Sequence, residues 1–518
     1  MQVSLKKLIV NPLTLLGLFL FSGALILAEQ QSYLYYLTVA QLIFIPVMVQ
    51  MVVNLKRWEQ ILISLGMAAA ALLTFDIQKE VAVFSTAIYL LSTIIIAKKG
   101  IGRFIRRGFT NTAEIIIDIG LVYLAVGGIW YFAYITGINT GFSPIITWLT
   151  AIHFHYSAFM LCISLGLFGR LYKGKGYTPV AWIIASGPIL VALGITFSTT
   201  IELISVVLYV IAIYGLFLMT CRTSLPMLQG ILIRLSIGTV CFTILWSLLY
   251  AFGNFTGNIL VGIPDMLTFH GMFNCIFFGT FTIIGWAVRV PESQHADYNF
   301  PVSKIRGSLK EEGEPHPGLV DNLAEYTNIE NLPVSIQHFY EQTEEYRLFA
   351  SVRWLAWFKP FAFIYQFVSR QVGQLNLPFS SNVNEMTGTI RKVDHVLDGR
   401  INPRVWRRKI EGETVFVAVY SKHIAQDRTY MNIALPLPFS TMVGILSLEE
   451  RNRQLHLTSI GHQDEGIYLA VGRYIMKLPL QEHFIIQKKS GELKATHDMT
   501  IFGLPFLHID YSIFHENK

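Results

Sequence analysis

Two histidines stand two residues apart in the stretch AIHFHYSAF, which begins at Ala151 inside a run that is otherwise almost wholly apolar. An imidazole titrates near neutral pH and can act as a base, a hydrogen-bond partner or a metal ligand. Helix positions two apart point to nearly opposite sides, so His153 and His155 can hold one ion together only if the helix is unwound there. His153 shares its stripe with the polar Ser157, whereas His155 shares its face with Trp148. We therefore expect His153 to face a polar interior and His155 to pack against apolar neighbours.

Three more polar side chains fall at a similar depth in other apolar runs. His270 and Asn274 lie one helical turn apart in DMLTFHGMFNCIFFG, and Glu202 lies near the start of the run 201–220. Ionisable groups in the hydrocarbon region of a bilayer are costly unless they are paired or hydrated, so they indicate a functional site. The sequence predicts a ligand-binding polar site in the outer half of the membrane, formed by His153, His155, Ser157, Glu202, His270 and Asn274.

The same residues allow two other interpretations. A membrane histidine can simply form a hydrogen bond across two helices, which stabilises the bundle by about 0.6 to 2 kcal/mol. Alternatively, His153, His270 and Glu202 could hold a zinc-like divalent ion that activates water on a lipid substrate. The sequence does not identify a cofactor. If the protein has one, a divalent metal is the cofactor that these residue types suit.

A second polar group is expected at the cytoplasmic end of the helices. Glu114 and Asp118 lie one turn apart in the run 114–137, and Arg234 lies at comparable depth in the run 229–251. These residues could form a structural salt bridge or the inner half of a proton or cation path. Histidines outside and carboxylates inside suit proton-coupled movement, so both interpretations stay open.

The elements that must position these residues are apolar helices. Of the 518 residues, 53% are hydrophobic and only 14% are charged, against about 25% charged in soluble domains. Runs of about 17 or more apolar residues predict about ten membrane-spanning helices. The runs lie near 11–28, 33–53, 60–76, 81–97, 114–137, 144–170, 179–198, 201–220, 229–251 and 265–288. The predicted fold is a polytopic α-helical membrane bundle over 1–290, followed by a cytoplasmic α+β domain.

Basic residues indicate how the helices are oriented. Lys and Arg precede the first run and follow the second, fourth, sixth and eighth runs, as they do in short cytoplasmic loops. An even number of spans then places both termini in the cytoplasm. The net charge of +6 follows these loops, so it supports this orientation and does not indicate nucleic-acid binding.

The composition changes after residue 290. A charged linker over 291–333, rich in Pro and Gly, is expected to be exposed. A helical entry over 334–376 contains the aromatic and basic segment Tyr346–Gln371, which suits either contact with the anionic cytoplasmic leaflet or a place in the core. Over 386–518, alternation with a period of two predicts an antiparallel sheet of about seven to nine strands.

Several stretches resemble the YndJ-like family of bacterial membrane proteins. They are HFHYSAF, FHGMFNCIFFG and the C-terminal HDMTIFGLPFLHIDYSIF, together with the layout of about ten helices. The resemblance covers most of the chain and implies a multi-pass protein of the bacterial plasma membrane, but it implies no reaction. From the residues, we expect binding or transport of a lipid or small hydrophobic molecule. A membrane-embedded metal-dependent lipid hydrolase and a structural assembly factor are the alternatives.

The basic loops generate a prediction about topology. A reporter fused after Lys518 should report the cytoplasm, and so should one inserted in KKGIGRF, because both positions lie on the basic side of the bundle. Protease protection or reporter activity in intact cells measures this. Detection of Lys518 outside the cell would reverse the assignment of the outer and inner polar groups.

Overall fold

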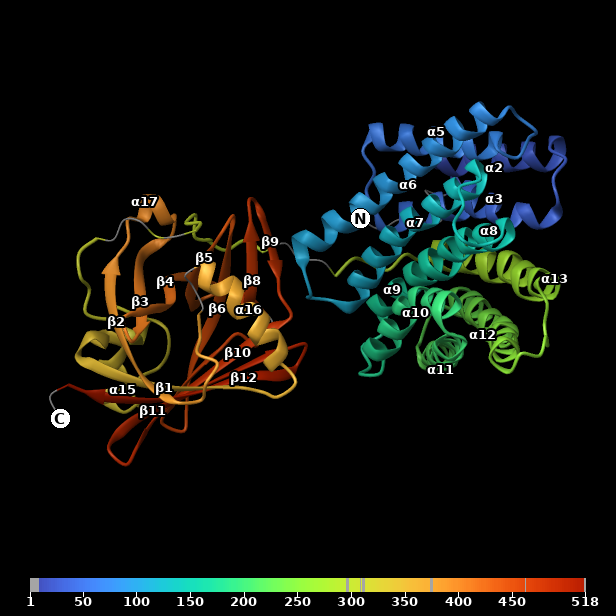
Figure 1. Cartoon of the computed structure of the whole chain (residues 1–518). Coiled ribbons are helices and arrows are strands. Elements are labelled where there is room, and N and C mark those ends of the chain that lie inside the picture. Colours follow the sequence, from blue (N-terminus) through green and yellow to red (C-terminus); the bar gives the residue numbers. More distant parts are fainter. Residues whose placement is uncertain are drawn as a thin grey trace. The chain divides into compact units, whose positions relative to one another are not determined.

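The computed structural model describes residues 9–294, 298–307, 309, 313–372, 376–461 and 463–516. Its contacts divide the chain into two compact units (Figure 1). The helical unit comprises Met1–Phe104 and Asn111–His295, and the barrel unit comprises Ile105–Thr110 and Ala296–Lys518.

The helical unit is a bundle of long apolar helices. Within the described residues, eight helices are long and apolar enough to cross a membrane: Ser32–Val52 (η1, α3, η2, α4), Lys79–Arg107 (α6), Thr112–Thr136 (α7), Pro144–Leu171 (α8, η3, α9), Tyr177–Phe197 (α10), Thr199–Arg222 (α11), Met227–Thr256 (α12) and Ile263–Val288 (α13, η4, η5, α14). Two further helices, α2 (Pro12–Leu27) and α5 (Arg57–Leu72), have 16 residues each and occupy the first and third predicted runs. The polytopic bundle is confirmed. One predicted loop is wrong, because KKGIGRF continues the helix α6.

Polar residues at the predicted helix starts make the caps that these helices need. The side chain of Asn111 accepts hydrogen bonds from the backbone at the start of α7, and Ser198 does the same for α11. Such caps satisfy N–H groups that have no partner within the helix. Gly137 ends α7 and Gly257 ends α12 in the left-handed conformation, which glycine adopts without strain.

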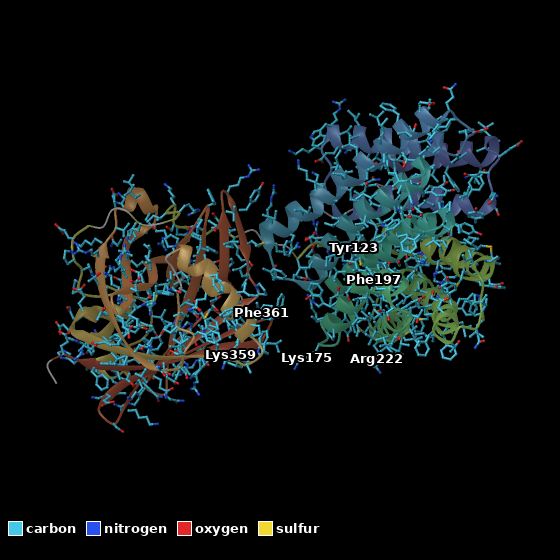
Figure 2. The ribbon with its side chains drawn as sticks, viewed as in Figure 1. Tyr123, Lys175, Phe197, Arg222, Lys359 and Phe361 are labelled. Atoms are coloured by element: carbon cyan, nitrogen blue, oxygen red, sulfur yellow. The ribbon has the colours of Figure 1, made fainter. Side chains whose placement is uncertain are left out.

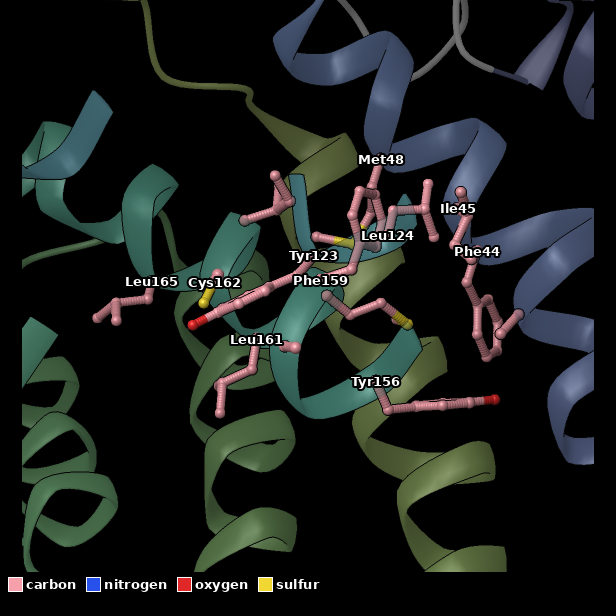
Figure 3. Close-up of a cluster of buried hydrophobic side chains, with 14 of the residues drawn as sticks. Phe44, Ile45, Met48, Tyr123, Leu124, Tyr156, Phe159, Leu161, Cys162 and Leu165 are labelled. Atoms are coloured by element: carbon pink, nitrogen blue, oxygen red, sulfur yellow. The ribbon is translucent and has the colours of Figure 1, made fainter. Parts of the chain in front are cut away.

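Three of the spanning helices contain π-helical turns, in which the backbone is wider than in an α-helix. These turns are η2 (Ala40–Phe44), η3 (Phe154–Met160), η4 (Met266–Met272) and η5 (Asn274–Gly279). Such turns are rare and occur frequently at functional sites. Three of the four turns, η3, η4 and η5, contain His155, His270 and Asn274 respectively. Figure 3 shows the apolar core beside η3, where the rings of Tyr156 and Phe44 meet edge to face with centres 6.2 Å apart.

An ion-pair network joins α6, α7 and α9 (Leu161–Leu171). Glu114 is fully buried, and its carboxylate accepts from Arg103 Nη2 at 2.6 Å and from Arg170 Nε at 2.8 Å. Arg103 Nε also donates to Asp118 at 2.6 Å. The structure thus pairs the two predicted carboxylates with Arg103 and Arg170. It does not bring Arg234 to them, because this guanidinium donates to the backbone carbonyls at the end of α11.

The barrel unit is a closed antiparallel sheet. Its strands are β1 (Tyr346–Trp354), β2 (Val383–Lys392), β3 (Ile401–Ile410), β4 (Glu413–Ala425), β5 (Arg428–Leu437), β6 (Ser440–Arg451), β7 (Gln454–Thr458), β8 (Gly466–Val471), β9 (Tyr474–Lys477), β10 (Leu480–Lys489), β11 (Glu492–Ile501) and β12 (Leu504–His515). They follow the order β5-β4-β3-β2-β1-β12-β11-β10-β7-β6-β8-β9, and the pairing of β5 with β6 closes the barrel. The antiparallel sheet is confirmed, and the expected count of about seven to nine strands is too low.

Tight turns connect many neighbouring strands. Several loops have two consecutive residues with positive φ: Glu411 and Gly412, Gln426 and Asp427, Asn452 and Arg453, Ser490 and Gly491, and Phe502 and Gly503. This backbone matches the right-handed twist of paired strands and fixes their register. Consequently, side chains at every second position point into the barrel.

The segment 291–333, which was expected to be an exposed linker, is partly buried. Leu319, Val320 and Leu323 belong to the core of the barrel unit, and Phe300 belongs to a smaller buried cluster. Its backbone also bonds to the sheet, since Lys304 N donates to Asp398 O at 2.7 Å. The expectation of exposure is wrong because apolar residues are interspersed among its charged ones.

The segment 334–376, which was expected to be helical, contains two α-helices and a strand within its described residues. Helix α15 (Val334–Glu341) comes first, but Tyr346–Trp354 is the strand β1, paired with both β2 and β12. After β1, Lys359–Val372 forms the helix α16, and Pro360 lies in its first turn, where proline is tolerated. Figure 2 labels Lys359 and Phe361 at the start of this helix.

Helix α16 generates a prediction about membrane contact. Phe361, Ile364 and Phe367 are 58%, 64% and 59% exposed, and the surrounding segment contains no acidic residue. Aromatic and basic side chains without carboxylates favour an anionic bilayer surface. A spin label at Ile364→Cys, in a Cys221→Ser background in anionic nanodiscs, should be more accessible to oxygen than to a polar nickel complex.

A matched label at Val396→Cys tests whether this result is specific. Val396 is 68% exposed on the short helix α17 (His395–Asp398), and its label should favour the polar reagent. Equal accessibility profiles at the two positions would contradict membrane contact by α16.

The ion-pair network generates a prediction about stability. Glu114→Gln should lower the free energy of unfolding by about 3–5 kcal/mol, because it leaves the guanidinium of Arg170 buried without its carboxylate. Unfolding in mixed micelles with increasing denaturing detergent measures this. Arg234→Gln is the control and should cost less, since the bonds of Arg234 to described residues go to backbone carbonyls and not to a carboxylate. A loss no larger than that of the control would contradict the structural importance of Glu114.

Candidate functional site

A cavity of about 290 Å³ lies within the helical unit. Its wall is mainly apolar and comes from the helices that contain η3 and η4 together with α10, α11 and α12. The polar side chains that line it include five of the six predicted site residues: His153, Ser157, Glu202, His270 and Asn274. The structure therefore brings these five residues to one place, which we call the membrane pocket.

His153 presents one ring nitrogen to the membrane pocket. Its Nδ1 lies 2.6 Å from the carbonyl oxygen of Leu149, one turn earlier. A carbonyl only accepts, so Nδ1 carries the hydrogen and Nε2 of the neutral ring is an acceptor. No partner for this Nε2 is present among the residues that the structure describes. Ser157 does not use it, because its hydroxyl donates to the backbone carbonyl of His153 at 2.8 Å.

His270 is arranged in the same way. Its Nδ1 lies 2.9 Å from the carbonyl oxygen of Thr243, so its Nε2 is also left as an acceptor. The rings of His270 and His153 stack with centres 6.1 Å apart. Asn274, one turn further, accepts from the Thr243 hydroxyl at 2.9 Å through Oδ1, and within the described residues its amide nitrogen has no acceptor. Thr243 thus orients both residues from the neighbouring helix.

Glu202 places a carboxylate in the wall of the membrane pocket. It lies in the first turn of α11 and is only 3% exposed. A helix N-terminus favours negative charge. Asn254 Nδ2 donates to the two carboxylate oxygens at 3.1 and 3.3 Å. Within the described part of the chain, no cation pairs with Glu202, so this group can still attract a donor or a positive charge.

His155 lies outside the membrane pocket. It is fully buried, its Nε2 lies 2.7 Å from the hydroxyl of Tyr89, and its Nδ1 lies 2.7 Å from the carbonyl oxygen of Ala151. A methyl group at Gly127 would approach Nδ1 to 2.7 Å, so this glycine makes room for the ring. Both ring nitrogens are satisfied, which is the geometry of a packing residue.

Sequence reasoning did not select several polar groups at this site. Asn254, Thr243 and Tyr250 contact or line the membrane pocket from α12. Their seven- and four-residue spacing places them near one face of that helix, and this periodicity was a usable signal. They were missed because neutral polar side chains are common in membrane helices and do not by themselves indicate a site.

The predicted metal ligands do not converge tightly. His153, His270 and Glu202 are not among the described groups whose His, Cys, Asp or Glu ligand atoms lie within 4.8 Å of one another. Such a group does occur in the barrel unit, where His338, Glu345 and His515 meet, with His515 Nε2 3.2 Å from Glu345 Oε2. Two imidazoles and a carboxylate are a ligand set that zinc accepts. The sequence concealed this set because His515 lies far along the chain from the other two residues.

Comparison with known proteins agrees with the resemblance seen in the sequence. The profile of the YndJ-like protein family matches residues 35–278, a range that includes every residue lining the membrane pocket. The chain is 38% identical over 430 residues to the "Uncharacterized membrane protein YndJ" of Bacillus subtilis (strain 168), which covers 78% of this chain and 79% of the relative. No solved structure matches the chain. On this sequence identity and the multi-pass helical bundle, the chain belongs to the YndJ-like family of membrane proteins.

Proposed function

We propose that this membrane protein binds a lipid or small hydrophobic molecule in the membrane pocket, as a receptor or as the binding step of transport. The observation that carries the proposal is an apolar cavity lined by the rings of His153 and His270, whose Nε2 atoms have no partner among the described residues. The carboxylate of Glu202 lines the same cavity, and its described partner is the neutral amide of Asn254. A mostly apolar cavity with a few convergent polar groups is the usual form of a small-molecule site.

The polar groups indicate which ligand chemistry fits. Two Nε2 atoms and a carboxylate are acceptors, so the ligand should carry N–H or O–H donors on an apolar body. Such a ligand would donate to acceptors in apolar surroundings, and each hydrogen bond of this kind contributes about 0.5–1.5 kcal/mol. The volume of about 290 Å³ is near the lower end of the range of about 300–1,000 Å³ for small-molecule pockets, which suits a single-chain amphiphile.

A photoreactive probe tests this proposal. We suggest dodecylamine carrying a diazirine on its chain. Methyl dodecanoate carrying the same diazirine is the control, because it has a similar chain and no N–H or O–H donor. In nanodiscs, the amine should label the apolar wall of the membrane pocket, and the ester should label it less. His153→Ala should reduce labelling by the amine about tenfold, the equivalent of one lost buried hydrogen bond.

Matched variants separate binding from packing. His270→Ala should reproduce the effect of His153→Ala, and the double variant should be no worse than either if both serve one site. Both should leave thermal stability nearly intact, because functional polar groups are usually costly to stability. His155→Phe is the control, and it should keep normal labelling. Unchanged labelling together with a clear loss of stability in the alanine variants would show that these histidines only join helices.

A membrane metal site is the rival proposal, and it is favoured by the stacking of His153 and His270 in one cavity with Glu202. An ion held there would activate water on a lipid substrate. Elemental analysis should use the His515→Ala variant, since the group of His338, Glu345 and His515 could bind zinc independently. Stoichiometric metal that persists in this variant and disappears in His153→Ala would favour the hydrolase over the binding protein.

A further inference from the structure

The barrel unit encloses a second cavity, of about 140 Å³. Inward-facing side chains of nearly every strand line it, and most of them are apolar. Phe339 and Tyr340 of α15 also contribute to its wall. We call this space the barrel cavity. It is about as large as apolar protein cavities that hold one aromatic ring.

A guanidinium group lines the barrel cavity without an anionic partner. Arg408 on β3 is only 9% exposed, and its Nε has no hydrogen-bond partner. Its guanidinium carbon lies 3.9 Å from the ring centre of Phe416, directly across the β3–β4 ladder, and 4.4 Å from that of Trp406. Among the described residues, no carboxylate lies within the 4.0 Å of an ion pair with Arg408.

This arrangement is costly for an empty barrel. A buried charge normally requires a partner of opposite charge and hydrogen bonds for its donors. Contacts with aromatic rings offset part of this cost but involve the flat faces of the guanidinium. Its N–H edge remains, and that edge matches a carboxylate in bidentate geometry. Arg408 Nε has no hydrogen-bond partner, and the hydrogen bond between Arg408 and the neutral Tyr511 phenol supplies no opposite charge. Among the described residues, the guanidinium therefore lacks the anion that this edge recognises.

The other polar groups of the barrel cavity limit the charge of the ligand. Glu482 on β10 lies 3.3 Å from Nε2 of His497 on β11, and His497 in turn stacks on Phe484 with ring centres 3.6 Å apart. Burial raises the pKa of the Tyr511 phenol, although Arg408 beside it lowers that pKa, so the phenol remains a neutral donor. One cation and one carboxylate in a small space favour a singly charged ligand over a phosphate dianion.

We propose that the barrel cavity binds a small monocarboxylate with an apolar body, such as an aromatic or short acyl acid, with its carboxylate on the N–H edge of Arg408. This site is independent of the membrane pocket, because it lies wholly within the barrel unit and takes the opposite ligand charge. The Tyr511 hydroxyl is placed to donate to the same carboxylate, and the apolar wall surrounds the body of the ligand.

Two probes test the charge preference in the wild-type protein. The full chain in nanodiscs is titrated calorimetrically with 4-fluorobenzoate and with the neutral 4-fluorobenzamide, which has nearly the same shape. We expect benzoate to bind about tenfold or more tightly than the amide, as a charge-assisted bidentate contact provides. Failure of benzoate to bind, or binding no tighter than that of the amide, overturns the proposal. This comparison needs no variant to fold.

Variants locate the contact. Arg408→Gln should remove the preference for benzoate, and Arg408→Lys should retain part of it, because lysine keeps the charge but lacks the planar fork. Glu482→Gln should tighten benzoate binding by removing a nearby negative charge. Lys409→Gln, an equal change in charge at an exposed neighbour, should have no effect. A benzoate affinity that is unchanged in Arg408→Gln, or equally reduced in Lys409→Gln, would place binding elsewhere.

Discussion

A polar or charged side chain in an apolar interior must be paired, and much of this structure follows from how that requirement is met. The clearest case is Glu114, which is fully buried yet bonded to two arginines from two other helices. The backbone N–H of Gln294 and the hydroxyl of Ser293 add two more donors to the same carboxylate. The network holds three helices and the chain that follows the last helix in one arrangement. No element in this region can shift without leaving a charge uncompensated.

In the membrane pocket, only one nitrogen of each histidine ring is paired within the described residues. Each of its histidines bonds a backbone carbonyl through Nδ1, and the described residues offer no partner to its Nε2. His155 shows the contrast, since the same residue type two positions away has both nitrogens occupied. The backbone contacts fix the tautomer and hold the rings in place, so the free nitrogens are preorganised rather than mobile. This is the difference between a histidine that supports a bundle and one that can receive a ligand.

The barrel unit depends on closure. The hairpin turns set the register between neighbours, and the pairing of β5 with β6 closes the barrel, with the hairpin of β8 and β9 continuing the sheet from β6. Once the sheet is closed, alternate side chains have no solvent to face, so Arg408 and Glu482 are enclosed with apolar neighbours. The pairing of the strands directs these charged side chains inward, although each would be more favourably solvated by water. Apolar packing therefore does not explain why these two positions are charged.

The sequence by itself determined the class of the protein and much of the residue set of its membrane pocket. Apolar runs long enough to cross a bilayer require a helical bundle, because backbone groups in hydrocarbon must be bonded within their own segment. Helical periodicity also placed His153 and His155 on different sides, and the structure agrees despite the π-helical turns of η3. Period-two alternation predicted the sheet, since that signal is local.

Only the tertiary structure decided the partners. Arg103 and Arg170 neutralise Glu114 in place of Arg234, and this depends on which helices are neighbours. Tyr346–Trp354 is a strand because β12, which lies far along the chain, offers it a partner, although its local sequence suited a helix. The group of His338, Glu345 and His515 and the barrel cavity arise for the same reason. Local periodicity records which way a side chain points within its own element, whereas contacts between distant elements depend on the packing of the whole chain.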